Sequence, residues 1–274
     1  DANGCVPLMQ MAHAWWLPGS ELFRWLVAFG ADLNATSNSG ETVRQCYRRA
    51  IIEAEEKQID TEVLQQMLAL LDNSELIDEF QGVFAKPAES SDDYFNRANC
   101  AMNLMQDTEL ASEEAVRAVE LDPDSLSRLV AELTVDDWPM QHAAAIAIGR
   151  LGERAVPAIP ELIKFLDDED EDIWTAVVDA LSQMGATAVP PLLEFIRSAT
   201  KEIAQRAGLA ILGICDANAG SPVFWLENFL PPDEDSLSGQ DAFDAAAIHG
   251  ALGDAEVYRG NYERAADEYE ASVN

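Results

Sequence analysis

The sequence predicts an all-α fold, a solenoid of repeated helical hairpins, on three observations. Ala143–Gly152 (AAAIAIGRLG) and Ala176–Gly185 (AVVDALSQMG) share a pattern 33 residues apart, and a third copy, Ala207–Gly213, follows 31 residues later. A proline follows each of the first two copies at the same offset, at Pro157 and Pro190. Apolar residues recur at helical spacing, and no segment shows the convincing alternation of a β-strand.

The amino-terminal part is expected to form helical hairpins of its own. Glu21–Asn34 (ELFRWLVAFGADLN) reads as a helix, a glycine that ends it and an Ala-Asp-Leu-Asn loop. These residues resemble an ankyrin repeat, whose loops read Gly-Ala-Asp-x-Asn, over about residues 1–72. The resemblance is degraded at Val6–Met9, which stands where Thr-Pro-Leu-His is usual. A second, longer unit is expected to use helices at 43–57 and 61–71 as a terminal cap.

The middle of the chain divides into a connector and three repeats. Residues 87–132 read as a helical connector, with helices expected at 96–105, 112–121 and 124–133. In 133–230, each repeat has an Ala-rich first helix, a Gly turn and a second helix. A proline starts each second helix, where the first amides have no intrahelical partner. The second helices are expected at 159–166, 192–196 and 224–230.

This middle block resembles HEAT repeats, especially the short bacterial kind of phycobilisome-lyase-like proteins, over about residues 133–230. That family usually places Val-Arg at the start of the first helix. Here the chain has Met140-Gln141, Ile173-Trp174 and Ala204-Gln205 instead. The resemblance therefore implies that acidic groups near these positions lack the arginine that often pairs with them.

The last block, 231–274, is expected to form one terminal hairpin. Leu252-Gly253, Gly260, Tyr262, Ala265 and Tyr269 have a spacing that resembles a tetratricopeptide repeat, although Glu256 stands where an aromatic is usual. One such hairpin must dock on its neighbours to bury its apolar face. The predicted domains are thus 1–86 (ankyrin-like repeats and cap), 87–132 (connector), 133–230 (HEAT-like repeats) and 231–274 (tetratricopeptide-like hairpin).

Composition restricts the classes of partner. The 274 residues include 50 Asp and Glu against 17 Lys and Arg, a net charge of −33, while 48% of residues are hydrophobic. An acidic but folded protein is expected. Nucleic acid is excluded as a direct ligand because phosphate contacts need Lys and Arg, and an anionic membrane surface is disfavoured too. The four blocks carry −7, −8, −9 and −9, so the charge is spread over the whole chain.

The cysteines and the apolar runs predict a cytoplasmic protein. Cys5, Cys46, Cys100 and Cys215 are far apart and form no Cys-x-x-Cys pair, which favours reduced, buried thiols. No apolar run approaches 18 residues, so no transmembrane helix is expected. The residues from Asp1 onward show no signal peptide.

The sequence shows no pattern of catalytic residues. His13, His142 and His249 have no second His or Cys at ligand spacing, and no Gly-Lys-Ser/Thr phosphate loop occurs. We therefore expect no cofactor, no metal and no enzymatic activity.

The run Asp167–Asp172 (DDEDED) has two interpretations. Counted from Asp168, acidic residues fall at positions 1, 3, 5 and 12 of a calcium loop, but Ile173 occupies position 6, where glycine is needed. We interpret the run instead as a solvated inter-repeat loop that also caps the next helix, or as an electronegative contact patch.

The tryptophans give further candidates for a partner contact. Trp25 lies among Leu22, Leu26 and Phe29 and is expected in the core. Trp15 and Trp16 are adjacent in the chain, so they cannot both face the core. Tryptophans bordered by charge favour protein contacts. The predicted partner-binding residues are Glu161, Asp167, Asp168, Asp170, Glu171, Asp172, Trp174, Glu194, Glu227, Trp15 and Trp16.

These features predict a non-catalytic protein that binds and masks a basic protein partner, as a monomer within a heterodimer. A bacterial immunity protein that neutralises a cationic, nuclease-like toxin would have this character. Two alternatives stay open: a scaffold or adaptor of a multiprotein complex whose acidity reflects salt adaptation, and a bilin-lyase-like accessory protein, which the resemblance to phycobilisome lyases implies.

Overall fold

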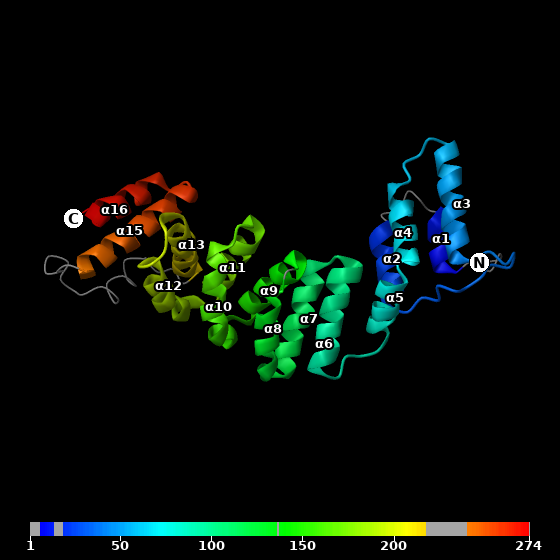
Figure 1. Ribbon diagram of the computed structural model, residues 1–274, viewed down its shortest axis with the longest axis horizontal. Helices are drawn as coiled ribbons and strands as arrows, with labels where there is room; N and C mark the ends of the chain where they lie inside the picture. Colours follow the sequence, from blue (N-terminus) through cyan, green and yellow to red (C-terminus); the bar gives the residue numbers. More distant parts are fainter. Residues whose placement is uncertain (1–5, 14–18, 136, 218–239, 274) are drawn as a thin grey trace. The chain divides into compact units, whose positions relative to one another are not determined.

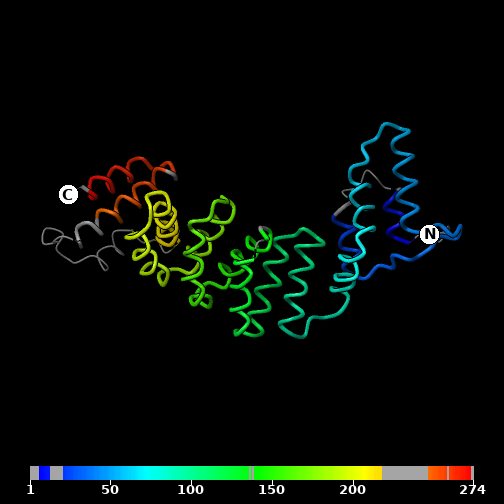
Figure 2. The backbone as a smooth tube through the Cα atoms, in the orientation of Figure 1, coloured from blue at the N-terminus to red at the C-terminus, as the bar shows by residue number. Residues whose placement is uncertain are grey.

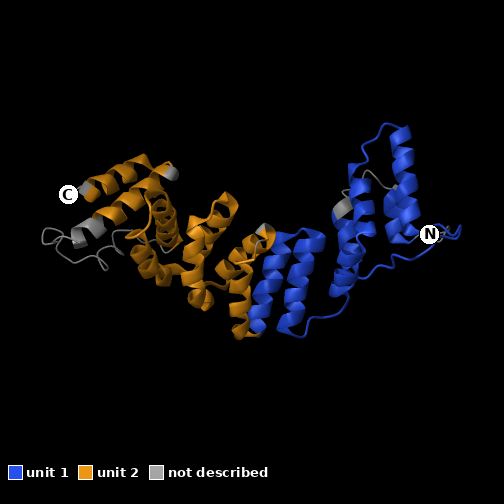
Figure 3. Ribbon diagram, in the orientation of Figure 1, with its two compact units in different colours: residues 1–121 blue, residues 122–274 orange. Residues whose placement is uncertain are grey.

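The computed structural model describes residues 6–13, 19–135, 137–217 and 240–273 (Figure 1). Every regular element in these residues is a helix, and the β-type pairing among them is one isolated bridge between Thr36 and Thr42. The predicted all-α helical-repeat fold is therefore confirmed. The chain forms two compact units, residues 1–121 (unit 1) and 122–274 (unit 2) (Figure 3).

Unit 1 consists of short helices joined by tight, capped turns. Its elements are α1 (Pro7–His13), α2 (Gly19–Ala28), α3 (Val43–Glu56), α4 (Glu62–Asp72), α5 (Ser74–Phe80), η1 (Val83–Ala85), α6 (Ser91–Cys100), the π-helical turn η2 (Ala101–Met105) and α7 (Thr108–Leu121). The helices predicted at 43–57 and 61–71 are present as α3 and α4. Helix α5 was not predicted; Asn73 ends α4 and caps α5 by accepting from the Leu76 amide.

Side chains tie the elements of unit 1 to one core. The Tyr47 hydroxyl of α3 donates to the Leu8 carbonyl of α1 at 3.1 Å, and the Tyr47 ring meets Phe23 of α2 edge-on at 5.5 Å. Arg24 of α2 donates to the Leu104 carbonyl in η2 at 2.7 Å. Helix α3 starts at a capping box between Thr42 and Gln45, which satisfies amides that the helix itself cannot.

Unit 2 contains the predicted repeats. Its elements are η3 (Pro123–Ser125), α8 (Leu126–Glu132), α9 (Trp138–Leu151), η4 (Gly152–Ala158), α10 (Ile159–Lys164), η5 (Phe165–Asp167), α11 (Glu171–Gln183), η6 (Gly185–Ala188), α12 (Val189–Ile196), α13 (Lys201–Ala217), α15 (Gln240–Tyr258) and α16 (Tyr262–Val273). Helices α9, α11 and α13 are the predicted Ala-rich first helices, and α10 and α12 are two of the second helices. The third second helix, predicted at 224–230, lies outside the described residues.

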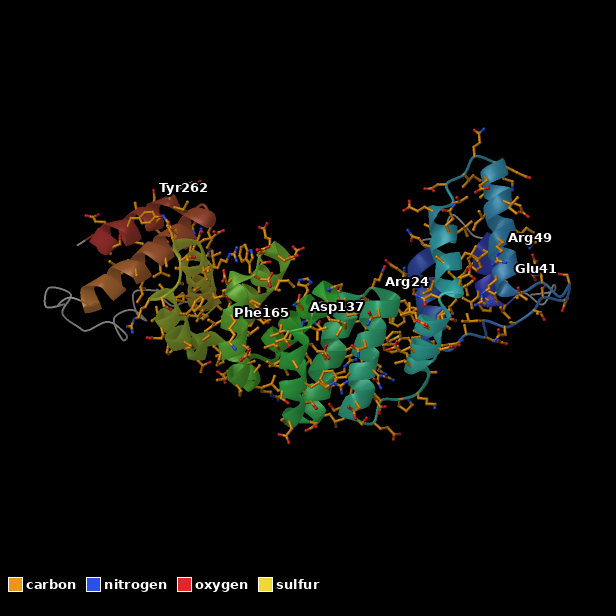
Figure 4. The ribbon with its side chains drawn as sticks, in the orientation of Figure 1. Arg24, Glu41, Arg49, Asp137, Phe165 and Tyr262 are labelled. Atoms are coloured by element: carbon orange, nitrogen blue, oxygen red, sulfur yellow. The ribbon has the colours of Figure 1, made fainter. Side chains whose placement is uncertain are left out.

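The repeat period is visible in the helix caps. Asp137, labelled at the start of α9 in Figure 4, accepts from the Met140 amide, and Asp170, 33 residues later, accepts from the Asp172 amide at the start of α11. A carboxylate at a helix amino terminus satisfies a backbone donor and interacts favourably with the helix dipole. The sequence therefore fixes both helix starts in the same way.

The first helices pack side by side, α9 on α11 and α11 on α13, and α15 of the terminal hairpin packs on α13 (Figure 2). Small residues make this approach possible. A methyl group added to Gly149 would lie 2.8 Å from the Ala180 Cα atom, and one added to Gly208 would lie 2.7 Å from the Ala251 carbonyl oxygen. The spacing of α9 from α11 and of α13 from α15 thus depends on the absence of a side chain at Gly149 and Gly208.

The terminal hairpin packs α15 on α16 around buried polar groups. Gly253 lies against the ring of Tyr269, whose hydroxyl donates to Asp254. Glu256 is 1% exposed, and its carboxylate accepts from the Asn261 amide side chain at 2.7 Å. A buried carboxylate needs such a partner, which accounts for a polar residue where the tetratricopeptide pattern has an aromatic.

The packing of Gly208 can be tested against a matched control in the adjacent helix. We expect Gly208→Ala to lower the free energy of unfolding by about 1–3 kcal/mol, because its methyl group would press on the α15 backbone. Gly250 of α15 has nothing within 4 Å of its added methyl group. We expect Gly250→Ala to raise the free energy of unfolding by up to about 1 kcal/mol, since alanine favours the helix. Urea unfolding followed by circular dichroism measures both, and changes of the same sign would contradict this packing.

The described cysteines are buried thiols, and this predicts their reactivity. Cys46, Cys100 and Cys215 form no disulfide, and burial raises the pKa of the Cys100 thiol to about 12 and that of Cys215 to about 11. Because the thiolate is the reactive form, we expect none of the three to be alkylated by iodoacetamide at about pH 8, near the ordinary thiol pKa of about 8.5. All three should react in urea. Peptide mass mapping locates the label, and rapid native labelling of Cys100 would contradict the core of unit 1.

Candidate protein-binding surface

The acidic run lies between two repeats of unit 2, where η5 ends and α11 begins. We call Asp167–Asp172 the acidic loop. Asp168 accepts from the Asp170 amide, and Asp170 accepts from the Asp172 amide, both at 2.9 Å. These two carboxylates hold the turn and cap α11, while Glu171 and Asp172 occupy the first helical turn, where negative charge is favoured. The interpretation of the run as a capping loop therefore has a local structural basis.

The calcium-loop interpretation finds no support in this geometry. Helix α11 begins at Glu171, and Ile173 is buried at 1% exposure, so the chain is already helical where a calcium loop would turn. Among the described residues, no group of three or more His, Cys, Asp or Glu is placed to hold a metal ion.

Arg206 of α13 holds the acidic loop from the following repeat. Its Nη1 donates to the carbonyls of Leu166 and Asp168, each at 2.8 Å. Its guanidinium also lies 4.7 Å from the centroid of the Trp174 ring. The resemblance implied that acidic groups in this region lack the family's arginine as a partner; an arginine does reach the loop, but it binds backbone oxygens and not the loop carboxylates. Arg206, one residue beyond the position where the arginine was sought, binds the loop backbone.

Trp174 has a different role from the one predicted. The side chain was expected to face a partner, but it is only 7% exposed because it packs beneath Arg206. An indole covered in this way supports the loop instead of anchoring an interface. The signal in the sequence was an arginine in the next repeat, which stacks on tryptophan better than lysine does.

The loop carboxylates are not neutralised within the described part of the chain. Arg206 approaches the backbone carbonyls, and its ion pair is with Glu202 at 3.7 Å. No described Lys or Arg forms an ion pair with any of five loop carboxylates: Asp167, Asp168, Glu169, Asp170 and Asp172. Glu169, which was not among the predicted contact residues, is exposed, as are Asp167, Asp170 and Asp172. A fixed loop thus presents uncompensated negative charge to solvent.

The second helices carry a different charge pattern. Glu161 of α10 pairs with Lys164 at 2.7 Å, and Glu194 of α12 pairs with Arg197 at 2.8 Å. The two pairs are related by the 33-residue period and lie at i,i+3 on exposed helix faces. Their carboxylates are partly compensated, unlike those of the loop. The remaining predicted contact residues, Trp15, Trp16 and Glu227, lie outside the described residues.

Comparison with known families agrees with this architecture. Residues 126–213, which span α8 to most of α13, match the family model of HEAT repeats. No curated protein was found to match the chain. The chain therefore contains HEAT-like repeats, which form a helical scaffold for protein interaction and are in general non-catalytic. None of the described helices is long and apolar enough to cross a membrane.

The contribution of Arg206 to the loop can be measured. We expect Arg206→Ala to lower the free energy of unfolding by about 1–3 kcal/mol, because two carbonyls lose their donor and Trp174 loses its cover. Arg206→Lys should recover only part of this loss, since lysine lacks the planar fork. The control is Lys164→Ala, which removes one exposed ion pair and should change the value by less than about 1 kcal/mol. Urea unfolding measures all three, and equal effects of Arg206→Ala and Lys164→Ala would contradict this role.

Proposed function

We propose that this chain binds and masks a basic protein partner, without catalysis, through the acidic loop and the carboxylates of the neighbouring second helices. The observation that carries the proposal is the combination found at the loop. Arg206 and the caps fix the backbone, while the five carboxylates have no cationic partner in the described part of the chain. A surface of this kind is preorganised for cations supplied by another molecule.

The electrostatics favour a partner that is basic over a wide area. Neighbouring carboxylates repel one another, by about 1 kcal/mol per pair at 4 Å in water and more near a protein surface. A cationic partner relieves this repulsion on binding. The net charge of −33 is spread over the chain, so it also accelerates encounter with such a partner, in a manner that salt weakens.

We favour the role of a bacterial immunity protein for this chain, with a cationic, nuclease-like toxin in the cytoplasm as the partner that it neutralises. Covering a basic substrate channel requires rigid carboxylates and no chemistry, which is what the loop supplies. In this proposal the second-helix residues Glu161 and Glu194 extend the contact. Trp15, Trp16 and Glu227 remain predicted members of it.

We infer that the flanking hairpins are repeats of other kinds. The Gly30 turn, the Thr36–Thr42 bridge and the capping box at Thr42 support an ankyrin-like repeat in unit 1. The contact of Gly253 with Tyr269 supports a tetratricopeptide-like terminal hairpin. Both are protein-binding classes of repeat, in keeping with the proposal.

Charge-neutralising variants test the proposal. The loop variant combines Asp167→Asn, Asp168→Asn, Glu169→Gln, Asp170→Asn and Asp172→Asn, the five carboxylates without a cationic partner among the described residues, and it keeps the oxygen atoms that cap α11. We expect it to reduce the low-salt capture of basic proteins from a lysate by about tenfold or more, equivalent to ~1.4 kcal/mol. Quantitative mass spectrometry of the captured proteins provides the measurement, and added salt should abolish the difference.

The matched control removes the same charge from exposed carboxylates of unit 1. It combines Glu55→Gln, Glu56→Gln, Glu75→Gln, Asp78→Asn and Glu79→Gln, all exposed residues. Capture by this variant should remain close to wild type. Equal losses in the two variants would indicate a non-specific charge effect and favour the scaffold whose acidity reflects salt adaptation.

A further inference from the structure

Three aromatic side chains of unit 1 form a cluster at the surface. The ring centroids of Trp25 and Phe29 are 5.6 Å apart, those of Phe29 and Phe84 are 5.7 Å apart, and those of Trp25 and Phe84 are 6.1 Å apart. We call these three residues the aromatic cluster. Trp25 was expected in the core; it is half-buried and packs against the core of unit 1. Phe29 is 51% exposed, and Leu22, one turn before Trp25 on α2, is 50% exposed. Adjoining exposed side chains of this size mark contact sites.

The aromatic cluster is held rigidly by two glycine turns. Gly30 and Gly82 both have positive φ angles, 83° and 79°, and a methyl group added to Gly30 would lie 3.5 Å from the Gly82 Cα atom. The Gly82 amide donates to the Val27 carbonyl at 3.3 Å, and the Gln81 side chain donates to the Ala31 carbonyl at 2.7 Å. Segments more than 50 residues apart are thereby fixed, so the rings are positioned before any partner arrives.

The arginines beside the aromatic cluster are already engaged within unit 1. Arg97 lies 5.1 Å from the centroid of Phe84, donates to the Lys86 carbonyl and pairs with the buried carboxylate of Glu114 at 3.7 Å. Arg24 of α2, labelled in Figure 4, is committed to the Leu104 carbonyl. Residues 1–121 hold 21 Asp and Glu against eight Lys and Arg. Unit 1 as a whole therefore carries a strongly negative net charge, and the arginines at the aromatic cluster are engaged within the unit.

We propose that Leu22 and the aromatic cluster form a docking surface for a basic, amphipathic segment of a partner protein. An apolar side chain of that segment packs against Leu22 and Phe29, and an arginine lies over the exposed part of the Phe29 ring. Among the described residues, contacts of this kind occur at Arg97 over Phe84 and at Arg206 over Trp174. The negative charge of unit 1 disfavours a second copy of the chain and favours a cationic segment.

A synthetic peptide tests the docking surface directly. The probe is an amphipathic helix with leucine on one face and arginine on the other, titrated calorimetrically into the full chain at low salt. We expect the double variant Leu22→Ala/Phe29→Ala to bind it about tenfold or more weakly than wild type, as for interface anchors. The control is Ile52→Ala in α3, a residue that is 57% exposed in the same unit. It should leave the affinity within about twofold.

The arginine contact has its own test. Wild type should bind the arginine peptide more tightly than the same peptide with lysine, because arginine stacks better on an aromatic face. Phe29→Leu, which keeps an apolar side chain, should abolish that difference. Three outcomes would each overturn the proposal. The double variant could bind the peptide as tightly as wild type, or Ile52→Ala could lose as much affinity as the double variant. The third is a concentration-dependent dimer of the wild-type chain that the double variant abolishes.

This inference rests on the proposed function only in taking the partner to be basic. Peptide binding to the full chain tests the docking surface in unit 1, whereas protein capture by the loop variant tests the acidic loop in unit 2. A chain that captures no basic protein but shows the expected peptide affinities would refute the proposed function and support the docking surface. The loop variant should bind the peptide with at least half the wild-type affinity.

Discussion

The close packing of α9, α11, α13 and α15 on one another is the constraint on which unit 2 depends. Gly149 meets Ala180 across the α9–α11 contact, and Gly208 meets the Ala251 backbone across the α13–α15 contact, at distances that leave no room for a methyl group. Protein interiors are packed densely enough that such contacts cannot be widened without losing others. The spacing of α9 from α11 and of α13 from α15 follows from these small residues, and Gly213, against the Ser182 side chain, has the same role between α11 and α13.

The acidic loop illustrates how that spacing becomes a surface. Because α13 packs on α11, Arg206 reaches back to the carbonyls of Leu166 and Asp168 and covers Trp174. The arginine compensates backbone oxygens and leaves the carboxylates to solvent. One internal cation therefore stabilises the loop backbone without neutralising the loop carboxylates. The acidic segment is thereby held in a fixed position while its charge stays available to a partner.

The period of the central block was enough to predict α9, α11 and α13, because alanine, glycine and proline recur there for local reasons that the sequence displays. Helix α5 was missed although the polar residues Asp72, Asn73 and Ser74 mark its boundary with α4. Asn73 both ends α4 and caps α5, so a single residue divides the two helices. The burial of Trp174 and the stacking of Phe29 were not predicted, since each depends on a contact with a distant segment, at Arg206 and Phe84 respectively. Local patterns determined the helices, whereas the candidate surfaces depend on tertiary contacts.

The acidic loop and the docking surface control different rates of binding, the first the association rate and the second the dissociation rate. Exposed carboxylates such as those of the acidic loop act at long range, so they raise the rate of encounter and are weakened by salt. Desolvated aromatic side chains act only at contact, so they lengthen the lifetime of a complex. A partner that engages both would associate quickly because of unit 2 and dissociate slowly because of unit 1. In such a complex, raised salt would slow association while leaving the dissociation rate nearly unchanged, which separates the two contributions kinetically.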